Sequence, residues 1–155
     1  MRTATMRRGF SLVELVIVVV IIGIIAAIAV PRMSRGAAGA ADSNLTANLR
    51  LLRNAIELYQ TEHQGTLPTA TSIVDQLTTY TDIAGTTNAT KTSTYIYGPY
   101  IRSVPALPVG ARRGSTGIAA ADAANIGWIY TESTGEIRAN TTTEADDRGV
   151  LYSAY

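Results

Sequence analysis

An apolar stretch near the N-terminus is the feature that most limits how this chain folds. From Leu15 to Val30 every residue is apolar or glycine, and just before this run Ser11 and Glu14 are the polar side chains that follow Phe10. As a helix with a rise of about 1.5 Å per residue, residues 10–30 span about 30 Å, the thickness of a bilayer's hydrocarbon core. A helix also satisfies the backbone polar groups of such a segment in lipid. The sequence therefore predicts a single-pass membrane helix.

Three arginines, Arg2, Arg7 and Arg8, precede this segment, and no acidic residue accompanies them. Positive flanks favour the cytoplasmic side of a membrane, so we expect the N-terminus inside and the rest of the chain exported. An alternative is an ordinary secretory signal cut at the A-x-A pattern of residues 27–29, which would release a soluble domain. The apolar region is longer than the roughly 7–15 residues of such a signal, and a secretory signal has no use for Glu14.

Glu14 stands about one turn into the apolar segment. A carboxylate costs about 2.5–3.5 kcal/mol at the centre of a bilayer, so it usually has a partner. Cleavage after Gly9 would create one, because the new α-amine of Phe10 is cationic at neutral pH. The amine could pair with Glu14 of its own helix, four residues along, or with Glu14 of a neighbouring copy, which would fix their axial register. The remaining alternative is that Glu14 extends to the lipid headgroups.

The run from Arg7 to Glu14 resembles the class III signal of type IV prepilins and pseudopilins, and the resemblance is strong over residues 7–35. It implies that a prepilin peptidase cuts between Gly9 and Phe10, that Phe10 is N-methylated, and that Glu14 is needed for assembly. It also implies a structural role in a filament rather than an enzyme.

The same resemblance implies an α+β protein with the type IV pilin fold. Residues 1–9 would be the leader peptide, residues 10–35 the transmembrane and filament-core helix, and residues 36–65 the amphipathic helix of a globular domain. Residues 66–155 would supply loops, a short helix and a small antiparallel sheet. The hydrophobic half of the long helix would protrude, and its amphipathic half would pack on the sheet.

Pro31 stands where that family commonly has a helix-kinking proline, and it removes one backbone donor from the helix. The resemblance favours one long, bent helix. The alternative is that the first helix ends at Pro31 and that a second one begins near Asp42.

An apolar stripe predicts the amphipathic helix between residues 41 and 63. The spacing within the stripe alternates between four and three residues, and its members are Leu45, Leu49, Leu52, Ile56 and Tyr59. On another face Arg53 and Glu57 can pair at i,i+4, and Gly65 with Pro68 should stop the helix. We expect the stripe to pack on the chain's own sheet, although a short coiled-coil seam has the same spacing.

The remaining residues predict short elements. A capping box at Ser72 indicates a helix that ends near Tyr80, and residues 82–94 read as an exposed loop. Residues 95–101 are extended, with prolines that prevent regular pairing, and residues 112–125 read as a second loop. The segments 126–130 and 136–140 predict a β-hairpin, with Trp128 and Tyr130 on one buried face.

The segment that begins at Gly98-Pro99-Tyr100-Ile101 is similar to one of the major pseudopilins of type II secretion systems, although Leu107 and Val109 depart from the pattern. This implies a homo-oligomeric pseudopilus subunit. Its partners would be the prepilin peptidase, minor pseudopilins and an inner-membrane assembly platform. Its place would be the inner membrane, with the C-terminal domain in the periplasm and the filament in the cell envelope. The alternatives are a true pilin for adhesion, motility or DNA uptake, or a membrane-anchored binding domain or enzyme.

Composition gives no sign of other chemistry. The formal net charge is +1, and without the three arginines of residues 1–9 it becomes −2, so no basic patch indicates nucleic acid. There is no cysteine, and His63 has no second histidine for a metal site, so we expect it to be a surface or C-terminal helix residue. No cofactor is expected. Glu144, Asp146 and Asp147 form an acidic cluster whose oxygens suit calcium, but their spacing matches no calcium motif. We therefore expect a solvated tail and no metal, with calcium as the alternative.

Overall fold

The computed structural model describes residues 10–155, and for residues 29–36 it describes the backbone alone. The leader, residues 1–9, with the predicted cleavage residue Gly9, lies outside the described residues. The contacts divide the chain into two units, one ending at Ala37 and the other running from Ala38 to Tyr155.

Helix α1 (Leu12–Glu62) is continuous through Pro31, so the alternative of two separate helices is wrong. A proline has no N–H, and α1 therefore lacks one backbone hydrogen bond at this position. The kink at Pro31 stays a prediction. After α1, Gly65 has a φ of 88° and donates its N–H to the carbonyl of Gln60 at 2.8 Å. This confirms the expected end of the helix, because glycine adopts positive φ without strain.

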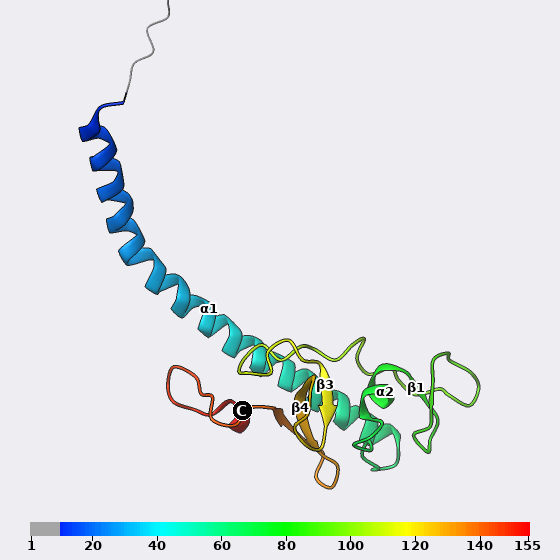
Figure 1. Ribbon diagram of the computed structural model, residues 1–155. Coiled ribbons are helices and arrows are strands. Elements are labelled where there is room, and N and C mark those ends of the chain that lie inside the picture. The colour runs from blue at the N-terminus through cyan, green and yellow to red at the C-terminus, as the bar shows by residue number, and fades with distance from the viewer. Residues whose placement is uncertain (1–9) are drawn as a thin grey trace, which may run out of the picture. The chain divides into compact units, whose positions relative to one another are not determined.

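The remaining elements are short (Figure 1). They are α2 (Ile73–Thr78), β1 (Tyr80–Thr81), β2 (Thr87–Asn88), β3 (Gly117–Ala119), β4 (Ile126–Thr131), β5 (Glu136–Ala139) and the 3₁₀ helix η1 (Tyr152–Ala154). Strands β1 and β2 form an antiparallel pair, and β3, β4 and β5 form a second sheet in that order. The expected α+β class is confirmed, and the architecture is consistent with a type IV pilin fold.

The larger sheet is mixed. Strands β4 and β5 form the predicted antiparallel hairpin, in which Thr131 pairs with Glu136 and Tyr130 with Ile137. Strand β3 joins the other edge of β4 in parallel, with an irregularity after Gly117. The sequence prediction missed this strand, which was expected to be loop. Parallel neighbours usually need a crossover of about a dozen residues or more, whereas only residues 120–125 separate these two strands.

The core confirms the amphipathic stripe of α1. All five members of the predicted stripe are at most 3 % exposed. In Figure 1 the C-terminal part of α1 lies beside β3 and β4, and their side chains belong to one hydrophobic cluster. Trp128 and Tyr130 are fully buried on the predicted face, and their polar ends donate hydrogen bonds to the carbonyls of Pro105 at 2.8 Å and Pro68 at 2.9 Å. Both aromatic side chains therefore enter the core without leaving a donor unsatisfied.

The sequence predictions for α2 and the residues after it agree with the structure only in part. Ser72 occupies the N-cap position, but its side chain makes no capping hydrogen bond, so the predicted capping box is absent. The helix ends at Thr78 rather than near Tyr80, because Tyr80 is already in β1. The segment expected to be an exposed loop contains β2, which pairs with β1.

Two predictions for the end of α1 need correction. His63 directly follows α1 and donates its N–H to the carbonyl of Tyr59 at 2.9 Å, as expected of a residue at the C-terminal end of the helix. It is not at the surface, however, since it is only 1 % exposed and its ring stacks on Tyr59 with centroids 3.8 Å apart. Its ring nitrogens lie 2.8 Å from the carbonyl oxygen of Tyr59 and 2.9 Å from that of Asp82. Arg53 does not pair with Glu57, because its guanidinium donates to the main-chain oxygens of Tyr155 at 2.9 Å and Ile137 at 3.4 Å.

Candidate functional site: the first turn of the N-terminal helix

The first turn of α1 carries an N-terminal cap. The carbonyl of Ser11 accepts the first helical hydrogen bond, from the N–H of Leu15 at 3.2 Å, which makes Ser11 the N-cap residue. The carboxylate of Glu14 turns back and accepts the main-chain N–H of Ser11 through Oε2 at 3.3 Å. This is the acidic half of a capping box, in which the third helical residue satisfies the N–H of the N-cap residue.

The sequence prediction gave Glu14 a cationic partner and did not include this cap. The Ser-x-x-Glu pattern of Ser11 and Glu14 is nevertheless visible in the sequence. A carboxylate at this position also suits the positive end of the helix dipole.

The expected cationic partner of Glu14 is not provided by the described residues, whose ion pairs are Arg112–Asp122 and Arg148–Asp146. Phe10, whose α-amine would become that partner after cleavage, is 82 % exposed. The roles of Gly9, Phe10 and Glu14 in processing and assembly therefore remain predictions.

From Leu15 to Ile28 helix α1 is apolar, and every residue of this part is exposed. An apolar surface of this extent is normally covered by protein or lipid. Within the residues whose side chains are described, no helix is both long and apolar enough to cross a membrane.

Comparison with known families gives a match over the same segment. Residues 5–30 match the family described as the prokaryotic N-terminal methylation motif. The chain carries the class III signal of type IV pilin-like proteins. No curated protein and no solved structure matches it. Type IV pilin-like proteins that carry this motif are structural proteins rather than enzymes, and the match covers the predicted processing and assembly residues Gly9, Phe10 and Glu14.

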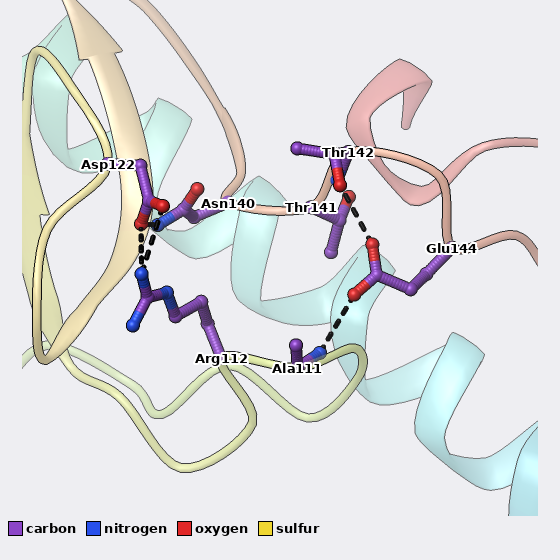
Figure 2. Close-up of a pocket in the computed structure, with 7 residues that line it drawn as sticks. All are labelled: Ala111, Arg112, Asp122, Asn140, Thr141, Thr142 and Glu144. Carbon is purple, nitrogen blue, oxygen red and sulfur yellow. Dashed lines mark hydrogen bonds and ion pairs between the residues drawn. The ribbon is translucent and has the colours of Figure 1, made fainter.

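A second polar region lies in the C-terminal loops. These loops line a hollow of about 200 Å³. In Figure 2 Arg112, Asp122 and Asn140 lie on one side of it and Glu144 on the other. Asp122 accepts hydrogen bonds from Arg112 at 2.9 Å and from the amide of Asn140 at 2.8 Å. These contacts join the loop before β3, the loop after it and the end of β5.

Glu144 holds two loops together through its carboxylate. Oε1 accepts the N–H of Ala111 at 2.9 Å, and Oε2 accepts those of Thr142 at 3.0 Å and Thr143 at 3.2 Å. These backbone hydrogen bonds, that from Ala111 above all, lower the pKa of Glu144 to about 2.

Asp146, the second member of the acidic cluster, is 7 % exposed. It accepts hydrogen bonds from the Tyr155 hydroxyl at 2.7 Å and the Val150 N–H at 2.8 Å, and it pairs with Arg148. The hydroxyl of Tyr155, followed by the Val150 N–H, holds the pKa of Asp146 well below its ordinary value. Across the described part of the chain, no three potential metal-ligating side chains gather in one place. The hydrogen bonds of Glu144 and Asp146 show that these carboxylates hold loops together.

Acid should release the Glu144 contact. Because the folded-state pKa of Glu144 lies below its ordinary value, its contribution to stability is complete above about pH 4.5 and is lost as the pH falls toward 2. We expect the variant Glu144→Gln to lose less stability than the wild type over this interval, as measured by urea unfolding at each pH. The control is Asp147→Asn, which changes a neighbouring exposed carboxyl. Parallel wild-type and Glu144→Gln curves would contradict the assignment.

Proposed function

We propose that this chain is the precursor of a structural subunit that assembles into a type IV pilus-like filament through helix α1. The observation that carries the proposal is the exposed apolar surface of residues 15–28, directly preceded by the carboxylate of Glu14 within the methylation motif. A prepilin peptidase removes residues 1–9, and Phe10 becomes the methylated N-terminus.

Before assembly the subunit resides in the inner membrane. The apolar run from Leu15 to Val30 supports a single-pass anchor, and Arg2, Arg7 and Arg8 support an inside orientation for the N-terminus. The C-terminal domain then lies in the periplasm, and the assembled filament belongs to the cell envelope. Its partners are further copies of the chain, the peptidase, an inner-membrane assembly platform and minor subunits.

Assembly transfers the helix from lipid to a bundle of similar helices. Lipid tails and packed Val and Ile side chains are about equally apolar, so this exchange supplies little hydrophobic driving force. Extraction therefore needs an external motor, and alignment needs a polar contact. Glu14 of one copy meeting the Phe10 amine of the next would provide that contact. A kink at Pro31 would let the helix bend as it enters the filament.

Within this class we propose a pseudopilus of type II secretion. The support is the segment that begins at Gly98, in which Ile101 is buried and the Tyr100 hydroxyl donates to Glu62 at 2.7 Å. The absence of cysteine agrees with this choice, since many major pilins close a C-terminal loop with a disulfide. Long surface filaments in electron micrographs of cells that express the chain at native level would instead favour a true pilus.

Mass spectrometry of the mature N-terminus tests the proposal. In cells with a working prepilin peptidase, we expect the chain to begin at Phe10 and to carry one methyl group on its amine. The variant Gly9→Val should keep the leader, because a branched side chain would replace the glycine at the cleavage bond, whereas Ala4→Val in the same leader should be processed normally. A chain that keeps Met1, or one that begins at Val30 after secretory cleavage, would contradict the proposal.

A further inference from the structure

The chain contains three Asn-x-Thr triplets, which begin at Asn44, Asn88 and Asn140. This triplet is the acceptor pattern for N-linked glycans, and an acceptor has to lie on the surface of an exported domain. In a threonine-rich chain such triplets also arise by chance, so the sequence alone does not identify an acceptor. The structure distinguishes the three, because each asparagine has a different environment.

Two of the three asparagines are not placed for glycan transfer. Asn44 lies within α1, where side chains two residues apart do not face each other, and the hydroxyl of Thr46 donates instead to a main-chain carbonyl one turn earlier, at 3.1 Å. Asn140 is 7 % exposed, and its amide nitrogen donates to Oδ1 of Asp122 and to the carbonyl of Ile126, both at 2.8 Å. A buried amide nitrogen with two acceptors cannot reach a sugar.

Asn88 has the opposite environment. It is the last residue of β2, which pairs only with β1 among the described strands. Residues 89–94, which follow it, are all exposed, and Figure 1 shows the green loops beside β1 at the outer side of the globular unit. Both described hydrogen bonds of the Asn88 side chain are made by Oδ1, so Nδ2 donates to no described residue. An enzyme can therefore approach this amide nitrogen from solvent.

Asn88 and Thr90 also form a closed turn. Oδ1 of Asn88 accepts the N–H of Thr90 at 2.9 Å and the hydroxyl of Thr90 at 3.1 Å. This is an Asx turn, in which the third residue of the triplet donates twice to the side-chain amide of the first. Both donors stabilise the negative charge that Oδ1 gains when Nδ2 gives up a proton. The hydroxyl of the triplet therefore already lies where it favours reaction at Nδ2.

From this geometry we propose that Asn88, and neither Asn44 nor Asn140, is glycosylated after export of the domain. The proposal rests on the proposed function for one point, the exposure of the globular unit to the periplasm. The donor is an oligosaccharide attached to a membrane lipid through a diphosphate. Thr86 stands two positions before Asn88, so the transferase is one that needs no acidic residue there.

The transfer exchanges one bond of the sugar for another. Nδ2 of Asn88 forms a bond to the anomeric carbon, and the bond from that carbon to the diphosphate oxygen breaks. The lipid diphosphate leaves with the electron pair of the broken bond, and the proton of Nδ2 passes to a base of the transferase. Because the Asx turn is formed before the enzyme binds, less conformational freedom of the acceptor is lost on binding.

Mass spectrometry of a tryptic digest tests the proposal on the mature chain purified from its own cells. Trypsin cuts after Arg and Lys and so places the three triplets on separate peptides, residues 36–50, 54–91 and 139–148. We expect the added mass of a glycan on peptide 54–91 alone, and none on this peptide in Asn88→Gln. A peptide 54–91 found only at its unmodified mass would overturn the proposal, as would equal modification of all three peptides.

Two substitutions of Thr90 test the part of its hydroxyl. Thr90→Ser keeps the hydroxyl and should keep the glycan, whereas Thr90→Val replaces the hydroxyl with a methyl group. A hydrogen bond to a charged group contributes about tenfold or more, so glycan occupancy should fall at least about tenfold in Thr90→Val. Because Thr90 is exposed, neither change should alter the stability of the fold. Full occupancy in Thr90→Val would overturn the proposal, as would a glycan that persists in Asn88→Gln on the Thr and Ser residues of this loop.

The same digest separates this proposal from the filament function. A methylated Phe10 terminus beside an unmodified peptide 54–91 would overturn glycosylation and leave the filament function intact. A glycan on peptide 54–91 of a chain that keeps its leader would support glycosylation and contradict the proposed processing. A chain that keeps its leader and carries no glycan would contradict both.

Discussion

Replacing Glu14 with alanine should abolish filament assembly while leaving leader removal intact. The carboxylate is the only charge in the described apolar part of α1, and the described residues offer it no cation. A hydrogen bond to a charged group contributes about 1.5–3 kcal/mol, which is roughly a 10- to 150-fold change in affinity at each subunit contact. Since every subunit of a filament repeats the contact, sheared filaments of Glu14→Ala should fall below detection by immunoblot.

The control for this experiment is Glu14→Gln. Glutamine keeps the length of the side chain and an oxygen that can accept the Ser11 N–H, but it has no negative charge. If charge attraction to the Phe10 amine aligns the subunits, Glu14→Gln should also fail to assemble, although its first turn remains capped. Normal filaments in Glu14→Ala, with a methylated Phe10, would show that alignment of the subunits comes from another contact.

Periodicity allowed the parts of the fold with strong local patterns to be predicted. The stripe that includes Leu45 and Tyr59 identifies a helical face because such a face repeats every 3.6 residues, and all five of its members are buried. The hairpin between β4 and β5 was also predicted, since Gly135 marks the turn between the two strands and adopts a φ of 73°. These elements depend mainly on neighbours in the sequence.

The parts that could not be predicted depend on distant residues. His63 can be buried because its Nε2 lies within hydrogen-bond distance of the Thr81 hydroxyl and the Asp82 carbonyl, about 20 positions further along the chain. Arg53 turns away from Glu57 because main-chain oxygens of the C-terminal region are within reach. Strand β3 forms only because β4 offers a free edge, and three residues carry no periodic pattern of their own.

For the candidate site, the sequence identified the functional residues but not the groups that form hydrogen bonds with them. The methylation motif predicted the importance of Gly9, Phe10 and Glu14, and the family match covers all three. The hydrogen bond from Ser11 to Glu14 was missed, although the capping-box spacing is present. The acidic cluster at Glu144 and Asp146 was expected to be a solvated tail, with calcium as the alternative. A sequence does not reveal that backbone N–H groups and a tyrosine hydroxyl donate hydrogen bonds to these carboxylates.

The second large effect is expected from Trp128→Ala. Trp128 is fully buried in β4, and its indole N–H donates to the carbonyl of Pro105 at 2.8 Å. Truncation of a buried aromatic residue costs about 3–5 kcal/mol, through lost burial and the cavity that remains. Small domains have a total stability of about 5–15 kcal/mol, so this single change removes much of it. Urea unfolding of the full chain in detergent, followed by circular dichroism, measures the loss.

Two controls make this result specific. Trp128→Phe keeps an aromatic ring but leaves the Pro105 carbonyl without its donor, so its cost should be smaller than that of Trp128→Ala. Leu58→Ala changes a side chain of α1 that is 49 % exposed and should alter the free energy of unfolding by about 0.5 kcal/mol or less. A loss below about 1 kcal/mol for Trp128→Ala would mean that β4 does not pack on α1. Because Glu14 lies outside this core, Glu14→Ala should leave the unfolding curve unchanged. An assembly defect without a stability defect would then separate the role of the first helical turn from that of the globular unit.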